Sequence, residues 1–165
     1  MSTNSTRPIK YGRLYTVPTK KTAPAARRTK PADLFDGHEK QFQVCAIDMV
    51  RYMASVKGIH ADRIMHIPNG GKRHAIEAKN LKRQGVVPGY PDIMVFRPAY
   101  YADDNRTYHG LALELKVWPG KPTEQQEHVH NLLRIAGWMV VVCYGMTTVE
   151  DTAREYFTRP AQATG

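Results

Sequence analysis

Hydrophobic positions along the chain follow two different periods, and each period predicts a type of element. Between residues 37 and 57, apolar side chains recur every three or four residues, which predicts an amphipathic helix that ends at Gly58. The same spacing predicts a second helix over residues 129–136, capped by Gly137, and a short last helix over residues 149–157. Each helix therefore presents one apolar stripe to a core.

Short apolar-rich runs bounded by glycine and proline turns predict strands. The run over residues 138–144 is almost unbroken, which is typical of a strand buried on both faces. A polar loop is expected over residues 101–107, and a short helix over residues 73–84 is stopped by Gly85. The four predicted strands cover residues 63–67, 92–96, 111–117 and 138–144.

The order of helices and strands predicts an α/β domain in which helices interleave with a mixed sheet. We expect this domain over residues 37–158, after a flexible arm over residues 1–36 and before a tail over residues 159–165. Prolines interrupt the arm, and residues 1–30 carry eight basic and no acidic side chains. The rest of the chain has sixteen basic and fifteen acidic residues, so most of the net charge of +9 belongs to the arm.

Composition excludes several classes of protein. With 165 residues, of which 42% are hydrophobic and 24% charged, the chain can bury one core and is not expected to be disordered throughout. No apolar run approaches the ~20 residues that span a bilayer, and no apolar stretch follows the basic amino-terminal segment to make a secretory signal. Cys45 and Cys143 lack CxxC spacing, which argues against a cysteine zinc site. We expect a cytoplasmic protein with no membrane association and with a polyanion as partner.

Two acidic residues on neighbouring predicted strands form the most informative pattern. Asp92 enters one strand, and Glu114 and Lys116 lie in the next. Because side chains alternate along a strand, Glu114 and Lys116 share one face, and pairing of the two strands brings Asp92 toward Glu114. Two carboxylates with open water positions suit Mg²⁺, and a nearby lysine suits activation of water and stabilisation of phosphoryl charge. The alternative is an ordinary exposed Glu–Lys strand face.

Further polar residues border this predicted site. Glu39 and Gln43 lie one turn apart on the first helix, on a stripe that continues into the core, although a first-turn Glu also complements the helix dipole. Thr123 and Gln126 match a capping box at a helix start. The functional alternative puts Gln125 or Gln126 near the metal site, in contact with a phosphate or a bound water, and both roles are compatible.

A basic cluster follows the turn at residues 68–71. The cluster consists of lysines and arginines with one acidic residue, Glu77, among them. Three of the basic residues lie along one line of the predicted helix. A solvated helix face is the default, but a phosphate track is favoured because the rest of the domain is nearly neutral. The glycine turn also offers backbone N–H groups to a phosphate. The DNA-binding candidates are Asn69, Gly70, Lys72, Arg73, Lys79, Lys82 and Arg83.

Seven histidines invite a metal-site hypothesis that their spacing does not support. Residues 128–131, with the sequence His-Val-His-Asn, resemble a fragment of an HNH nuclease motif. They fall inside a helical pattern, however, where positions i and i+2 do not share a face. The remaining histidines show no recognisable ligand spacing, so a histidine metal site is rejected.

Six motifs follow one another in a fixed order along residues 38–145. They are Glu39 with Gln43, Asn69-Gly70-Gly71-Lys72-Arg73, Leu81-Lys82-Arg83-Gln84-Gly85, Pro88-Gly89-Tyr90-Pro91-Asp92, Leu113-Glu114-Leu115-Lys116 and Thr123-x-x-Gln126. Together they resemble the virus-type replication-repair nuclease (VRR-NUC) domain, a branch of the PD-(D/E)XK nuclease superfamily.

The resemblance implies a restriction-endonuclease-like core of αβββαβ type, here with an inserted helix, and a phosphodiesterase that depends on Mg²⁺ or Mn²⁺. It implies catalytic roles for Asp92, Glu114 and Lys116, with Glu39 and a glutamine in support. The spacing from the capping threonine favours Gln126 as that glutamine. The implied metal ligands are Asp92, Glu114, Glu39 and the backbone carbonyl of Leu115.

Small stand-alone members of the family that this chain resembles are homodimers that prefer branched DNA such as four-way junctions. We therefore expect a homodimeric, structure-selective DNA endonuclease, since no base-reading motif is present. A non-catalytic nucleic-acid-binding protein and a nuclease acting on flaps or RNA remain alternatives, and a viral origin with action in a host cell stays open. Apolar interface candidates are Tyr100, Tyr101, Trp118 and Trp138, of which Trp138 fits the core better.

Overall fold

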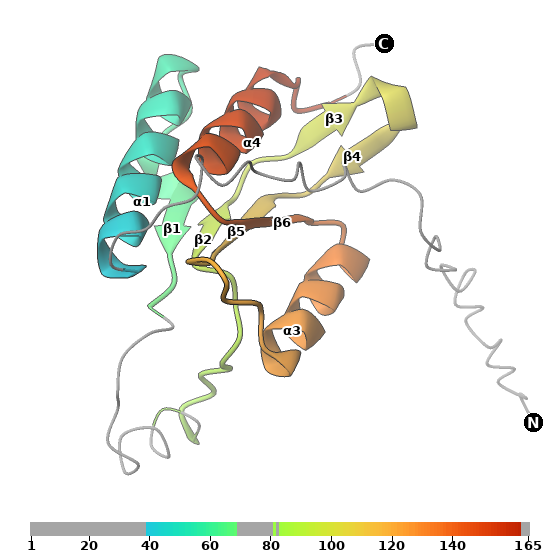
Figure 1. Cartoon of the computed structure of the whole chain (residues 1–165). Coiled ribbons are helices and arrows are strands. Elements are labelled where there is room, and N and C mark those ends of the chain that lie inside the picture. The colour runs from blue at the N-terminus through green and yellow to red at the C-terminus, as the bar shows by residue number, and fades with distance from the viewer. Residues whose placement is uncertain (1–38, 69–80, 82, 163–165) are drawn as a thin grey trace, which may run out of the picture.

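The computed structural model describes residues 39–68, 81 and 83–162, which build helices and strands around one main sheet (Figure 1). Single-turn 3-10 helices at Ala61–Arg63 and Ala102–Asp104 join some of the elements. The helices and strands are α1 (Glu39–Val56), β1 (Ile64–His66), β2 (Ile93–Val95), β3 (Ala99–Tyr101), β4 (Arg106–Tyr108), β5 (Leu111–Leu115), α3 (Glu124–Ile135), β6 (Met139–Cys143) and α4 (Met146–Thr158).

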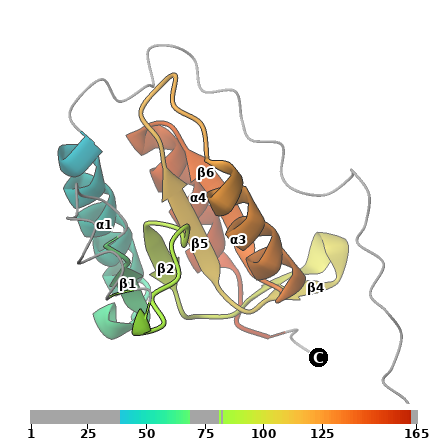
Figure 2. The ribbon, with the colours of Figure 1, turned by 90° about the horizontal axis from the view of Figure 1, so that it is seen from below.

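The main sheet has four strands in the order β1-β2-β5-β6. Strands β1, β2 and β5 are antiparallel to their neighbours, whereas β5 and β6 are parallel and are joined by the crossover helix α3. Helices α1 and α4 pack on one face of the sheet and α3 packs on the other (Figure 2). This mixed sheet flanked by helices confirms the predicted α/β fold class.

Two apolar layers hold the sheet between the helices. On one face, Phe42 of α1 and Tyr156 of α4 belong to the same buried cluster as Leu113 of β5. On the other face, Val129 of α3 packs with Ala112. All residues of β5 are buried, so this strand is covered on both sides. No helix in the described part of the chain is long and apolar enough to cross a membrane.

The polar loop expected over residues 101–107 is instead part of a β-hairpin. Strands β3 and β4 pair antiparallel, and Asn105 turns the chain with a left-handed φ of 48°. The rings of Tyr101 and Tyr108 are buried and meet edge to face, with 5.3 Å between their centroids. The prediction was wrong because two tyrosines bury the inner face while the residues between them stay polar. Tyr101 therefore belongs to the core and is not a free interface residue.

Strand β6 contacts the apolar layers on both faces of the sheet, as predicted, but its edge position leaves it less completely buried than expected. Its neighbour in the sheet is β5, and residues 140–142 keep partial exposure. Trp138 is half-buried and meets Phe96 edge to face, with 5.2 Å between ring centroids. It also packs against the smaller apolar cluster beneath α3, as its preferred core role predicts.

The helix predicted over residues 73–84 lies almost wholly outside the described residues, as does the predicted arm over residues 1–36. At its predicted end, Gly85 adopts a left-handed φ of 86°, and the N–H of Val86 donates to the carbonyl of Leu81 at 3.0 Å. This hydrogen bond over five residues is typical of a helix end, in agreement with the predicted stop at Gly85.

Candidate active site

Antiparallel pairing of β2 with β5 brings the predicted acidic residues together. Ile93 lies opposite Leu113, so Asp92, one residue before β2, lies across from Glu114. The backbone N–H of Leu115 donates to Oδ2 of Asp92 at 2.9 Å. The predicted approach of the two strands, and with it the meeting of Asp92 with the Glu-x-Lys segment, is confirmed.

The turn that delivers Asp92 packs against the first turn of α3. Gly89 in this turn has a left-handed φ of 93°, and a Cβ there would lie 2.9 Å from the carbonyl oxygen of Gln125. Only glycine allows both this backbone conformation and this close approach. The contact therefore fixes the start of β2 beside the amino end of α3.

Glu114 is fully buried beneath α3 and is held by three donors. Because Leu113 faces α1 and α4, strand alternation turns Glu114 toward α3. Its Oε1 accepts from Nε2 of Gln126 at 2.6 Å and pairs with Nζ of Lys116 at 2.7 Å, and its Oε2 lies 3.2 Å from Nε2 of His130. These contacts compensate a carboxylate removed from water. The alternative of an exposed Glu–Lys strand face is wrong, since Glu114 has no exposed surface and the Lys116 side chain is only 17% exposed.

Gln126, rather than Gln125, contacts the carboxylate of Glu114. Its Oε1 accepts from the backbone N–H of Thr123 at 3.0 Å, which completes the predicted capping box, while its Nε2 donates to Glu114. One amide thus completes the capping box and also reaches Glu114. Gln125 is exposed and its Nε2 donates to the carbonyl of Pro88 at 3.4 Å.

His130 is a site residue that the sequence analysis missed. Its side chain is fully buried, and no described group forms a hydrogen bond with its Nδ1. A proton on Nδ1 would be an orphaned buried donor, so the neutral tautomer with the proton on Nε2, which donates to Glu114, fits the surroundings. The spacing of four residues between Gln126 and His130, which puts both on one helix face, was the available signal.

Asp92 carries a shifted pKa because of its position at the mouth of this site. The pKa of Asp92 is raised from 3.8 to about 6, mostly by burial and also by the nearby charge of Glu114. The N–H of Leu115 and the charges of Lys116 and His66 act in the opposite direction. Ionisation of Asp92 is therefore less favourable here than it is for an aspartate in water. A nearby cation would counteract this effect.

Gln43 and His66 both contact Asp92. Nε2 of Gln43 donates to Oδ1 of Asp92 at 3.3 Å, so the stripe on the first helix does reach the site. Nδ1 of His66 lies 2.8 Å from the backbone carbonyl of Asp92, and since a carbonyl only accepts, Nδ1 carries a proton. The Gln43 amide, also 3.3 Å from this Nδ1, therefore donates to the carboxylate instead. The sequence analysis did not place His66 here, because no ligand spacing marks it.

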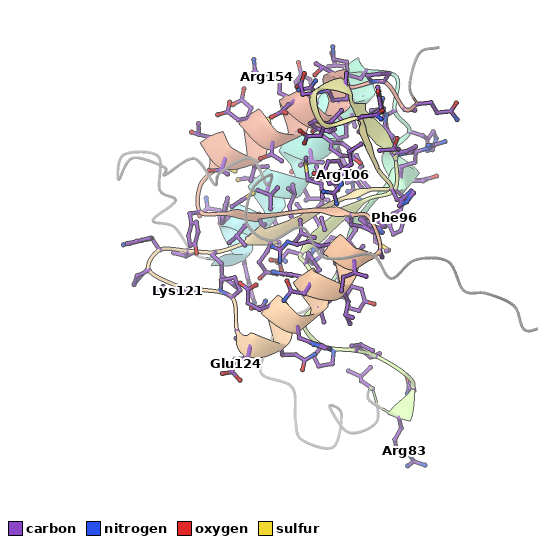
Figure 3. The ribbon with its side chains drawn as sticks, turned by 90° about the vertical axis from the view of Figure 1, so that its right-hand side faces the viewer. Arg83, Phe96, Arg106, Lys121, Glu124 and Arg154 are labelled. Atoms are coloured by element: carbon purple, nitrogen blue, oxygen red, sulfur yellow. The ribbon has the colours of Figure 1, made fainter. Side chains whose placement is uncertain are left out.

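Several predicted residues lie outside the described part of the site. Helix α1 begins at Glu39, but its side chain is not described. Arg83 is described and exposed, and it projects away from the sheet (Figure 3). The remaining predicted DNA contacts fall outside the described residues: Asn69, Gly70, Lys72, Arg73, Lys79 and Lys82.

The donors present suit a hard divalent cation. Asp92 and Glu114 supply carboxylate oxygens, which Mg²⁺ and Mn²⁺ prefer over nitrogen or sulfur. In the part of the chain that the structure describes, no three His, Cys, Asp or Glu side chains gather as a metal-binding group. Two carboxylates with a backbone carbonyl and water still fit Mg²⁺, which keeps several of its waters in proteins.

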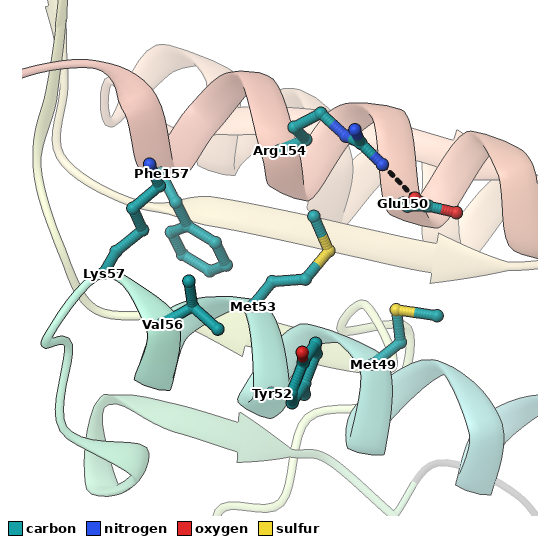
Figure 4. A pocket seen from close by; sticks show the side chains of 8 residues that line it. All are labelled: Met49, Tyr52, Met53, Val56, Lys57, Glu150, Arg154 and Phe157. Carbon is teal, nitrogen blue, oxygen red and sulfur yellow. Dashed lines mark hydrogen bonds and ion pairs between the residues drawn. The ribbon is translucent and has the colours of Figure 1, made fainter.

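A pocket between α1 and α4 lies on the other face of the sheet from Glu114 (Figure 4). Its charged residues include Glu150 and Arg154, which pair with each other. The pocket therefore offers no second carboxylate pair. Its lining residues are Met49, Tyr52, Met53, Val56, Lys57, Glu150, Arg154 and Phe157.

Comparison with known proteins agrees with this geometry. Neither the known family models nor the curated proteins give a match to this chain. Among solved structures, the fold matches a chain described as a VRR_NUC domain protein, with 27% sequence identity and a TM-score of 0.58. The match covers 74% of this chain and 89% of that chain. This match supports a VRR-NUC domain with a restriction-endonuclease-like, mixed α/β fold.

Proposed function

We propose that this protein is an endonuclease that uses Mg²⁺ or Mn²⁺ to hydrolyse phosphodiester bonds in DNA, with a preference for branched DNA such as four-way junctions. A VRR-NUC domain indicates a nuclease of the PD-(D/E)XK type. One observation carries the proposal beyond that: Asp92, Glu114 and Lys116 come together at one end of the sheet, with Lys116 Nζ 2.7 Å from Glu114 Oε1. A sheet with a purely structural role would not require a buried carboxylate at this position.

The carboxylates of Asp92 and Glu114 would hold the cation, with the backbone carbonyl of Leu115 and, by family resemblance, Glu39. When bound, the cation supplies Lewis acidity that offsets the charge developing on the phosphate in the transition state. Its positive charge also favours the ionised form of Asp92, whose pKa of about 6 leaves it partly protonated in weak acid.

The chain's own groups orient the reactants. Lys116, partly exposed at the edge of the site, is placed to hold an attacking water and to donate to a phosphate oxygen. Gln126 and His130 fix the rotamer of Glu114 from the α3 side, so that its Oε1 faces Lys116. Gln43 does the same for Asp92 from α1. Such positioning lowers the reorganisation needed when the reaction occurs.

The proposed substrate preference follows from charge and from the lack of base-reading motifs. The basic residues of the arm over residues 1–30 suit phosphate contacts, which bind without regard to sequence. One active site cuts one strand, whereas a junction requires two cuts related by symmetry. A two-fold dimer supplies both cuts. Sedimentation of the full chain well above micromolar concentration distinguishes this dimer from a monomer of about 19 kDa.

The test of the function compares cleavage of linear, flapped and four-way-junction DNA by the full chain in Mg²⁺, Mn²⁺ and EDTA. Asp92→Asn, Glu114→Gln and Lys116→Met keep side-chain shape, and each should lower the rate by at least about 100-fold while DNA binding in EDTA persists. Glu150→Gln is the matched control, since this carboxylate lies on α4 away from the site. Circular dichroism verifies that every variant is folded.

Metal-dependent cleavage that survives in all three site variants contradicts the assignment of the site. Binding to DNA with no cleavage in any metal favours the non-catalytic alternative, in which the acidic residues are a remnant. Cleavage of RNA in preference to each DNA substrate keeps the site and corrects the substrate.

A further inference from the structure

An exposed tryptophan and a partly buried tyrosine border the candidate active site. Trp118 is 61% exposed, which is unusual for a side chain this large. Its ring meets that of Tyr144 edge to face, with 6.0 Å between centroids and 70° between planes. The contact restrains the indole while most of its surface stays open to solvent.

The topology puts this pair at the same sheet end as the carboxylates. Strands β5 and β6 are parallel, Leu115 lies opposite Cys143, and the N–H of Lys116 donates to the carbonyl of Cys143 at 2.9 Å. Tyr144 therefore follows β6 directly beside Lys116, and Trp118 follows Lys116 by two residues. The pair lies at the carboxyl ends of β5, which carries Glu114, and of its neighbour β6.

The loop that carries Trp118 is basic. Between Lys116 and Thr123 the connecting loop carries no acidic residue, and Lys121 projects from it into solvent (Figure 3). The exposed Lys121, three residues after an open indole, combines attraction for phosphates with a flat apolar surface. This is the combination with which proteins bind unpaired strands, because bases stack on aromatic rings while cations follow the backbone.

We propose that Trp118, supported by Tyr144, is a stacking platform for an unpaired nucleobase next to the phosphate that is cut. The proposal rests on the proposed nuclease function and gives that site a physical basis for structure selectivity. Bases inside a duplex stack on each other and are unavailable, whereas bases at a flap or a junction point can rotate onto the ring.

A second copy of the chain is a poorer occupant for the same surface. A stable protein interface buries about 800 Å² on each partner, with an apolar centre. Trp118 is followed by Pro119, Gly120 and Lys121, all exposed, so the surroundings are a polar loop rather than an apolar patch.

Tryptophan fluorescence can report stacking on Trp118, because the chain has two tryptophans in different surroundings. Trp118 is exposed, whereas Trp138 is half-buried against Phe96 at the opposite sheet end. In EDTA, which prevents turnover, a flapped or single-stranded oligonucleotide should quench the emission of the full chain. The variant Trp118→Phe, which keeps only Trp138, should show no quenching with the same DNA.

Affinity measurements on matched variants give the second readout. Trp118→Leu keeps an apolar side chain but loses the ring, and it should bind flapped DNA at least about fivefold more weakly while binding to blunt duplex is unchanged. Phe96→Leu removes another exposed aromatic ring, at the far end of the sheet, and should change neither affinity.

The outcomes separate the platform from the nuclease. Cleavage by the wild type without quenching of Trp118 overturns the platform and leaves the nuclease intact; quenching that persists in Glu114→Gln, which does not cut, supports the platform independently of catalysis. Equal weakening of flap and duplex binding by Trp118→Leu overturns the platform. The platform is also overturned if Trp118→Leu changes the protein from dimer to monomer and DNA does not quench the wild type, because the ring then belongs to a protein interface.

Discussion

Replacement of Asp92 by asparagine should stabilise the metal-free protein at neutral pH, although it is expected to abolish cleavage. The side chain is partly buried, and its carboxylate lies close to that of Glu114, so ionisation is opposed by burial and by like charge. Asparagine retains an oxygen that accepts from the N–H of Leu115, the contact made by Asp92 at 2.9 Å. The change thus removes the charge while the shape and one hydrogen bond are kept.

The size and pH dependence of this effect follow from the pKa. Burial raises the pKa of Asp92 from 3.8 to about 6. A carboxyl group whose pKa is raised on folding destabilises the protein when ionised: the effect is absent below the unfolded value, grows between the two values and is complete above the folded value. The difference between the two pKa values corresponds to a full destabilisation of about 3 kcal/mol. Solvent screening of a partly exposed group reduces it, so we expect a gain of about 1–2 kcal/mol above pH 7 and none near pH 4.

Urea unfolding of the full chain in EDTA, at pH 7.5 and at pH 4, measures the difference between Asp92→Asn and the wild type. Asp48→Asn, an exposed carboxylate on α1, is the control and should leave the free energy of unfolding unchanged at both pH values. Mn²⁺ should stabilise the wild type, by about 2.7 kcal/mol at 100 times its Kd, and stabilise Asp92→Asn much less. A variant that is less stable at pH 7.5, or a difference independent of pH, would refute burial of the ionised carboxylate as the cause.

Two further predictions concern parts of the chain around the site. His130→Leu leaves Glu114 Oε2 without its donor, so it should lose about 1–3 kcal/mol of stability and bind Mn²⁺ more weakly in calorimetry. His130→Gln has an amide that reaches the same point and should restore most of the stability and of the Mn²⁺ affinity. Equal behaviour of the two variants excludes a role for the N–H. Deletion of residues 1–30 removes eight basic side chains and should weaken DNA binding and flatten its salt dependence, as fewer counterions are released; an unchanged slope of log Kd against log salt means that the arm does not contact DNA.

The parts of the fold that the sequence predicted are those in which one period persists long enough to be recognised. The first helix and strand β5 have clear patterns, and both lie where apolar periodicity puts them. The hairpin of β3 and β4 escaped prediction because its strands have three residues each and are joined by polar side chains. Strand β6 was found, but its place at the sheet edge depends on strand order, which periodicity does not encode.

The candidate site shows the same division between local and long-range information. Asp92, Glu114 and Lys116 could be related through the alternation of side chains along strands, which is a local rule. His130 could not, because its role depends on how α3 lies across the sheet. The sequence analysis compared it with His128, two residues away, whereas its partner in function is Gln126, four residues away.

The donors that surround the two carboxylates come from elements that are far apart in the sequence. Gln43 belongs to α1, Lys116 follows β5, and Gln126 and His130 belong to α3. Except for Lys116, which is two residues from Glu114, these donors reach the carboxylates only when the sheet and its helical layers have formed. A buried Glu114 without these donors would carry an uncompensated charge, so loss of α3 packing should remove the site and destabilise β5 together. Activity and folding are therefore expected to fail jointly when the packing of α3 is perturbed, whereas Asp92→Asn should abolish cleavage and leave the protein folded.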